Sequence, residues 1–291
     1  MPVTTAPRTD RVPLLARQAA AEFIGSALLA ATVVGSGIAA QRLSPQDRGL
    51  QLLENALITG AVLVALILAL GPVSAAFNPV VTLVERALGA VTTAAAAIFL
   101  ACQVAGCCLG VMLANLMFDL PAVNISNHDR TGGDLLLAEA VATFGLIVII
   151  FAVVRSGRSQ AVAFAVGGYI TAAYWSTSST SFANPAITVG RTLSNTFAGI
   201  APASVSGFVA LQVVGAAVGL TAALLLYPKH TNWPLTSPPL PRPPSHSRAH
   251  EPPGRPVCLR PQRRSQPGRE SPYRAPRAKT HRGTVGWQRA W

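Results

Sequence analysis

The chain has 291 residues, of which 51% are hydrophobic and only 12% are charged, and its mean hydropathy is positive. A water-exposed globular surface could hardly accommodate this composition, so it excludes an ordinary soluble protein and predicts one that lies in a bilayer. The formal charge of +12 suggests a nucleic-acid binder, but residues 228–291 hold 13 of the 23 Lys and Arg residues and only 2 of the 11 acidic residues. We therefore expect a basic tail and no nucleic-acid partner.

Six stretches of the chain are apolar enough to cross a membrane, which takes roughly 20 mainly apolar residues per helix. In chain order they are about 19–41, 52–71, 88–116, 135–154, 159–176 and 202–227. Their interiors are almost free of charge. The exceptions, Glu22 and Glu139, stand near the start of the first and the fourth stretch. The predicted fold is an all-α membrane protein with six transmembrane helices.

The two halves of the chain carry the same motifs in the same order. Each half has a Glu in its first stretch, an Asn-Pro dipeptide after its second, and a Gln-x-x-Gly in its third, at Gln103 and Gln212. Three spans are an odd number, so the second half must enter the membrane upside down relative to the first. This pattern predicts an inverted 3+3 repeat.

Each Asn-Pro box opens a segment of about ten residues, too short to cross the bilayer. The boxes are Asn78-Pro79-Val80 and Asn184-Pro185-Ala186. One Asn-Pro pair is a weak signal, because it simply favours a turn or a helix start, but two at repeat-equivalent positions are specific. Asn is a strong N-cap and Pro suits the first helical turn, so we predict re-entrant half-helices over 78–87 and 184–194. Their positive ends should meet near the membrane centre, where loop carbonyls and Asn amides line a wet pore that opposes cations.

With these motifs the chain resembles the major intrinsic protein family, the aquaporins and aquaglyceroporins, over residues 18–227. The resemblance rests on Ala21-Glu22-Phe23-x-Gly25, both boxes, Glu139 and the two Gln-x-x-Gly stretches. It implies a passive, homotetrameric channel for water and small neutral solutes, with no cofactor, metal or catalytic residue. It also implies that four buried polar residues hold loop backbone through hydrogen bonds: Glu22, Glu139, Gln103 and Gln212. A proton relay is the rival interpretation of the two glutamates.

The resemblance places the selectivity ring at Thr59, Ala172, Ser181 and Ile187. Most family members have Arg where this chain has Ile187, and Ile supplies only bulk. Arg191 is not expected to replace that Arg, because it lies a full turn further along. We therefore expect a wide, weakly polar ring that passes larger neutral solutes. The stretches 179–186 and 195–200 also resemble a bacterial branch associated with arsenic detoxification, which implies arsenite or methylated arsenicals besides polyols.

The first box departs from the family spacing, because Gly71 to Asn78 is one residue shorter than usual. This should pull Asn78 out of register or force the backbone to compensate, so an impaired pore is one alternative. A secondary transporter of a small neutral solute is another, although it would need ion-coupling carboxylates near the midplane, and the span centres here are uncharged. An enzyme would need a nucleophile, a metal cluster or an acid-base pair, and the sequence offers none.

Charge distribution predicts the topology and the segments. Lys and Arg are more frequent on the side of the termini, whereas Asp47, Asp119, Asp129 and Asp134 fall opposite. We expect a multi-pass protein of the cell membrane, plasma or inner, in contact with membrane lipid and with both termini cytoplasmic. Residues 1–17 form an N-terminal cytoplasmic segment, 18–227 the channel domain, and 228–291 a disordered Pro/Arg-rich tail.

Overall fold

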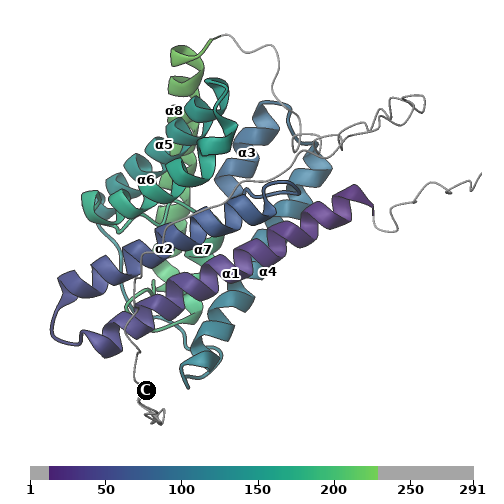
Figure 1. The fold of residues 1–291 in the computed structure, drawn as a ribbon. Coiled ribbons are helices and arrows are strands. Elements are labelled where there is room, and N and C mark those ends of the chain that lie inside the picture. Colours follow the sequence, from purple (N-terminus) through teal and green to yellow (C-terminus); the bar gives the residue numbers. More distant parts are fainter. Residues whose placement is uncertain (1–12, 229–291) are drawn as a thin grey trace, which may run out of the picture. The chain divides into compact units, whose positions relative to one another are not determined.

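The computed structural model describes residues 13–228, so the predicted tail and the first twelve residues lie outside the described range. Within that range the regular structure is helical apart from one isolated bridge (Figure 1). Five helices are long and apolar enough to cross a membrane. They are α1 (Leu14–Leu43), α2 (Arg48–Leu70), α4 (Thr93–Met117), α5 (Gly133–Arg155) and α8 (Pro202–Leu226).

The fifth predicted span, 159–176, is a composite of two short elements. A 3-10 turn, η1 (Ser159–Ala161), leads directly into α6 (Val162–Ser176), whose 15 residues pack against α2. The third span begins later than predicted. Its helix starts at Thr93 because the hydroxyl of Thr92 accepts a hydrogen bond from the backbone N–H of Ala95, and residues 88–92 link it to the preceding half-helix.

Both predicted half-helices are present. The first is α3 (Pro79–Ala87), and the second is α7 (Pro185–Gly190) followed by the 3-10 turn η2 (Arg191–Leu193). Asn78 and Asn184 are the N-caps, and each side chain accepts a hydrogen bond from the backbone N–H two residues on. The cap and the following Pro therefore define each start as the sequence predicts.

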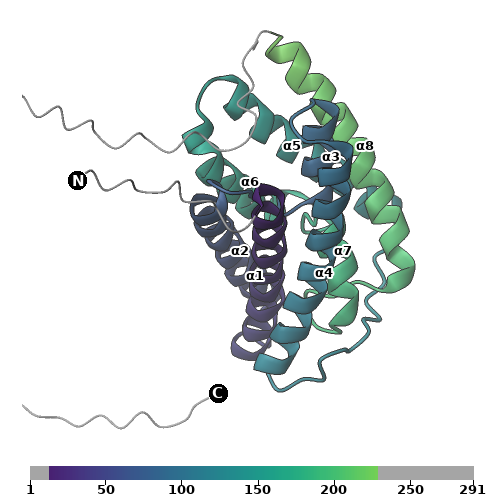
Figure 2. The ribbon, with the colours of Figure 1, turned by 90° about the vertical axis from the view of Figure 1, so that its right-hand side faces the viewer.

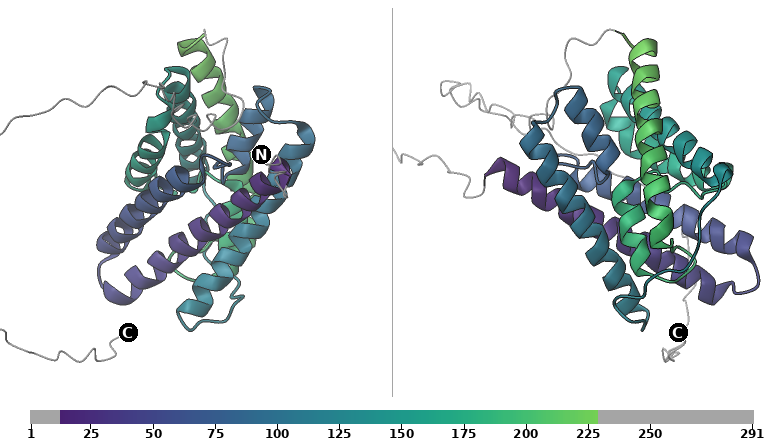
Figure 3. Two further views of the ribbon diagram at one scale, coloured as in Figure 1. Left: turned by 45° about the vertical axis from the view of Figure 1, so that its right-hand side comes forward. Right: turned by 180° about the vertical axis from the view of Figure 1, so that it is seen from behind.

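The helix contacts repeat between the two halves. α1 packs along α4 as α5 packs along α8, and α2 meets α6 between the halves (Figure 2). Each half-helix contacts the last long helix of both halves, so α3 and α7 lie between α4 and α8. The views from two further sides in Figure 3 show the α1–α4 and α5–α8 pairs running side by side. This is the arrangement expected of an inverted repeat.

Glycines of the Gln-x-x-Gly stretches set how closely the paired helices approach. A Cβ on Gly106 would overlap the backbone carbonyl of Phe23, and one on Gly110 would overlap that of Ala27, so α1 and α4 touch through their backbones. Gly215 meets the carbonyl of Ala140 in the same way, which brings α8 against α5. Close backbone contact through small residues is the usual packing mode of transmembrane helices.

Candidate channel pore

The two half-helices meet head to head through their caps. The Asn78 side chain donates from Nδ2 to the carbonyl of Ala183 at 2.8 Å, and Asn184 Nδ2 donates to the carbonyl of Phe77, also at 2.8 Å. Each asparagine thus caps its own helix through Oδ1 and binds the loop of the other half through Nδ2. The two predicted boxes therefore touch in the interior of the protein.

The loop residue before each asparagine has an uncommon backbone conformation. Phe77 has φ 49° and Ala183 has φ 46°, in the left-handed region that non-glycine residues seldom adopt. Such residues cost free energy and persist only where their surroundings hold them. The surroundings here are two buried carboxylates, one for each loop.

Glu22 and Glu139 hold the two loops with the same set of bonds. The Glu22 carboxylate accepts from the N–H groups of Ala76 and Phe77 at 2.9 and 2.8 Å. The Glu139 carboxylate accepts from Phe182 and Ala183, both at 2.9 Å. Both glutamates are fully buried. Neither lines the cavity described below, which speaks against a proton relay along it.

The two glutamines complete each cluster from the third span of their half. Gln103 donates from Nε2 to Glu22 at 2.7 Å and to the Thr82 hydroxyl at 2.9 Å. Gln212 does the same to Glu139 at 2.6 Å and to the Thr188 hydroxyl at 3.0 Å. Each cluster therefore ties a half-helix, its loop and two long helices together.

The backbone compensates for the shortened first loop. Glu22 accepts one bond that Glu139 does not, from the Ser74 hydroxyl at 2.5 Å, and the N–H of Ser74 folds back to the carbonyl of Leu70 at 2.9 Å. The Phe77 ring fills the space over Gly25, where a Cβ would overlap it. Asn78 consequently keeps its register with Asn184, and the alternative of a displaced cap is wrong.

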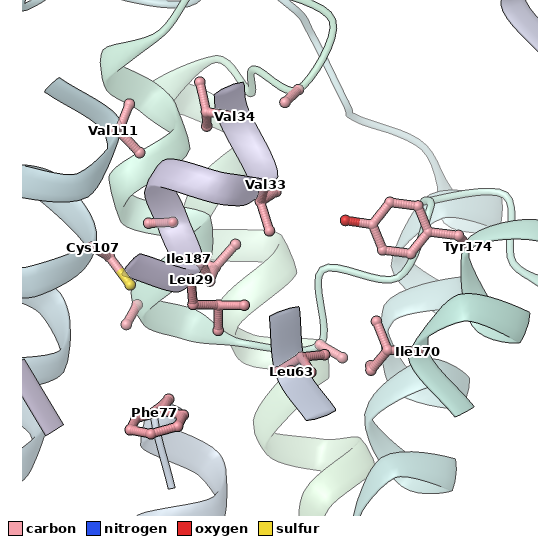
Figure 4. Packing of buried hydrophobic residues seen from close by; sticks show 14 of the residues in the cluster. Leu29, Val33, Val34, Leu63, Phe77, Cys107, Val111, Ile170, Tyr174 and Ile187 are labelled. Atoms are coloured by element: carbon pink, nitrogen blue, oxygen red, sulfur yellow. The ribbon is translucent and has the colours of Figure 1, made fainter. Parts of the chain in front are cut away.

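A cavity of about 190 Å³ runs past both asparagines. Its wall is mostly aliphatic and comes from α1, α2, α5 and α6, with residues such as Leu29, Leu63 and Ile170. Figure 4 shows these side chains converging from their separate helices around a common centre, with Ile187 among them. Polar side chains are few, and most of them lie at the boxes or come from α2, α6 and the segments around α7; Glu85 of α3 is the exception.

Comparison with known proteins gives a single family. The family model of the major intrinsic proteins matches residues 10–161. Aquaglyceroporin AqpS of Rhizobium meliloti (strain 1021) is 49% identical over 207 residues, which cover 71% of this chain and 88% of that protein. The chain belongs to the major intrinsic protein family. It is an integral membrane channel for water and small solutes, and not an enzyme.

The X-ray structure of the aquaglyceroporin from Plasmodium falciparum has the same fold as this major intrinsic protein. It superposes with a TM-score of 0.53 at 19% identity and covers 74% of this chain and 96% of that one. At this identity the likeness concerns the fold alone. It agrees with a fold of six spans and, in addition, two re-entrant half-helices.

Three of the four ring residues predicted for this family member line the cavity: Thr59, Ser181 and Ile187. The Thr59 hydroxyl lies 3.2 Å from that of Tyr174, within hydrogen-bonding distance. The Ser181 hydroxyl is buried and has no partner within residues 13–228.

Ala172 is not in the ring, and its prediction is wrong. It is exposed on the outer face of α6, whereas Ile170 and Tyr174 of the same helix line the cavity. An α-helix turns about 100° per residue, so a difference of two residues in counting places a side chain on nearly the opposite face. Figure 4 shows the Tyr174 ring extending from α6 with its hydroxyl toward Val33. The count from Asn184 failed because the turns of the loop between α6 and α7 cannot be read from spacing.

Arg191 lines the cavity, contrary to expectation. It lies four residues after Ile187, and since a turn of helix is 3.6 residues, both side chains share one face. Glu85, on the same face of α3 as Val81, also lines the cavity and was not anticipated. The spacing of four from a pore-lining residue was the signal that could have identified Arg191.

The loop between α4 and α5 packs over η2. The N–H groups of Asn124 and Ser126 donate to the carbonyls of Leu193 and Thr192 at 2.9 and 2.8 Å. Further along, hydrogen bonds from Thr131 and Ser204 lower the pKa of Asp129. Burial lowers the pKa of Arg130, whose guanidinium lies 5.0 Å from the centre of the Phe182 ring. This loop therefore braces the segment that carries Arg191.

Proposed function

We propose that this channel conducts neutral polyhydroxylated solutes besides water, namely glycerol-like polyols and, given their similar size and hydrogen bonding, arsenite or methylated arsenicals. The observation that carries the proposal is the cavity itself, in which both Asn caps and a few hydroxyls stand opposite an aliphatic wall. A polyol has a carbon face and a hydroxyl face, so it can keep both in contact with such a passage. The name aquaglyceroporin, given to the relative in Rhizobium meliloti, agrees with it.

The boxes would serve as the central binding point. Each Asn uses Oδ1 and one N–H within the protein, so its second amide N–H is left to donate to a permeating oxygen. A solute then exchanges water contacts for these donors and for loop carbonyls. Thr59, Ser181 and Ile187 would form the ring through which it passes, and the two Glu–Gln clusters would keep the loops rigid.

The test is a flux measurement on proteoliposomes without any ion gradient. Stopped-flow swelling with water, glycerol and arsenous acid gradients should show all three crossing, whereas a coupled carrier would stall. A wild type that passes only water would contradict the proposed solutes. No flux at all would favour the impaired pore.

The variant Ile187→Arg tests the ring in the same assay. A second guanidinium narrows the passage and disfavours the carbon face of a polyol, so glycerol and arsenous acid fluxes should fall far more than water flux. Ile187→Leu is the matched control, because a volume-conserving apolar swap usually costs little. Equal fluxes of all three molecules in Ile187→Arg and wild type would show that Ile187 does not set the filter.

We also propose that the channel domain, residues 18–227, assembles as a homotetramer in the cell membrane with both termini in the cytoplasm. Large apolar side chains are exposed on its outer faces, for example Leu57, Phe164 and Leu225. These faces need lipid or neighbouring subunits to cover them. Crosslinking in native membranes should yield species up to four subunits, and finding monomers alone would contradict the assembly.

A further inference from the structure

The end of the second half-helix presents a cation, Arg191, to the cavity, although Arg191 was not expected to replace the ring arginine. Arg191 is 2% exposed, and its Nε donates to the carbonyl of Ala198. Its guanidinium lies 3.4 Å from the centre of the Phe182 ring. Phe182 is supported by an edge-to-face contact with Phe208 at 5.3 Å. The guanidinium is thus held in one orientation.

Arg191 has no ion-pair partner within residues 13–228. The nearest compensation comes from the charge of Glu139, which acts on it from beyond ion-pair distance, and the hydrogen bond that its side chain makes within the protein runs from Nε. A buried charge without a partner is costly, so it persists in a membrane protein where it faces water or a ligand. The cavity that Arg191 lines is the place where its remaining N–H groups can find an acceptor.

The same cavity offers hydroxyls to accompany these donors. Tyr174 and Thr59 form a bonded pair from α6 and α2, and the Ser181 hydroxyl comes from the loop before the second box and has no partner within the described residues. Ile187 adds an aliphatic surface one turn from Arg191. Together they combine a fixed cation, three hydroxyls and one apolar face around the second box, whereas the one carboxylate that lines the cavity, Glu85, comes from α3 in the first half. The group around Arg191 suits a neutral molecule with several oxygens and repels a cation.

We propose that Arg191, one helical turn beyond Ile187, is the fixed cation of this pore and determines, with Tyr174, Thr59 and Ser181, which molecules pass. Its guanidinium donates hydrogen bonds to the oxygens of a neutral solute and keeps cations out. The hydrogen bonds from Arg191 to a neutral solute rest on the proposed conduction of such solutes. The exclusion of cations by Arg191 requires no more than a channel that passes water.

The experiment compares Arg191→Leu and Arg191→Lys with wild type in proteoliposomes at matched protein content. Water and glycerol fluxes are measured by stopped flow, and proton and Na⁺ leaks by dyes inside the vesicles. Removing a charge from a low-dielectric passage lowers the barrier to cations, so Arg191→Leu should raise the leak per unit of water flux at least about tenfold. Arg191→Lys keeps the charge but loses the planar fork, so its leak should stay low while its glycerol-to-water flux ratio falls.

Arg155→Leu is the matched control. Arg155 is the last residue of α5, and its Nε also donates to a backbone carbonyl, that of Tyr227 at 2.8 Å. Unlike Arg191, it does not line the cavity. Its loss should leave the leak per unit of water flux unchanged. A merely structural role for Arg191 would reduce all fluxes together without raising that ratio.

Three results overturn the inference. They are an unchanged leak ratio in an Arg191→Leu protein that conducts water, an equal rise in Arg155→Leu, and an unchanged glycerol-to-water ratio in Arg191→Lys. The last comparison decides the matter alone if Arg191→Leu does not reach the membrane. A wild type that passes water but no glycerol overturns the proposed solutes instead, and the leak comparison then still decides on Arg191.

Discussion

Each of the two buried carboxylates is held by hydrogen-bond donors and has no ion-pair partner within the described residues. Glu139 accepts from two loop N–H groups and from Gln212. Glu22 has the corresponding three donors in the first half and the Ser74 hydroxyl as a fourth. Hydrogen bonds to a charged acceptor contribute more than neutral ones. These bonds stabilise the left-handed backbone conformation of Phe77 and Ala183, the residues before the two boxes, which would otherwise relax.

Glu139→Gln should therefore destabilise the channel. A carboxamide has one acceptor oxygen, and its amino group would face a loop N–H that also donates, so the change should cost on the order of 2 kcal/mol. Thermal unfolding in detergent measures the loss, and water flux per folded protein should fall with it.

Glu54→Gln is the matched control for that variant. Glu54 accepts a single bond, from the Ser44 hydroxyl at 3.0 Å, and one of its carboxylate oxygens is buried without a partner within the described residues. Its replacement should cost under about 1 kcal/mol. Equal losses for the two variants would mean that Glu139 has no special part in holding the loop.

At the scale of elements, the sequence predicts those features that depend on a short stretch of chain. Spans follow from the length of apolar runs, and half-helices follow from the Asn cap and the Pro after it. The sequence does not predict which way the side chains of a helix point when an irregular loop separates that helix from the residue used for counting. Thr180 and Ser181 both have positive φ, and this path determines how α6 is rotated relative to Asn184. The error at Ala172 and the omission of Tyr174 both arise there.

Helix contacts within each half depend on glycines, and Gly110→Ala tests this. Its added methyl would overlap the carbonyl of Ala27, so α1 and α4 would have to separate, at a cost of about 1 to 3 kcal/mol. Gly168→Ala on α6 is the control, because nothing lies within 4 Å of its Cβ position and Ala favours a helix. The thermal unfolding midpoint should drop for the first variant and hold or rise for the second. A drop of the same size in both would contradict close packing at Gly110.

At the scale of the whole molecule, the two halves complete each other. The cap of each half binds a carbonyl of the other, and each half-helix packs against the last long helix of both. Neither half has a finished pore by itself. The network that builds the passage therefore spans the chain from Glu22 to Gln212.

Because that network ends well before the tail, removal of residues 235–291 should leave assembly and flux unchanged. A truncation after Leu220 is the informative contrast. It removes Ala223, which is buried in a cluster with Val80, and the Tyr227 carbonyl that Arg155 binds. The first truncation should insert and conduct like the full chain per unit of protein, whereas the second should lose stability because α8 no longer covers α3. Size-exclusion chromatography and stopped-flow water flux measure the assembly and the conduction of both truncated chains.

Failure of the chain lacking 235–291 to insert would contradict this prediction. It would show that the tail supports the fold, since the loss of a segment outside the network could not otherwise affect insertion.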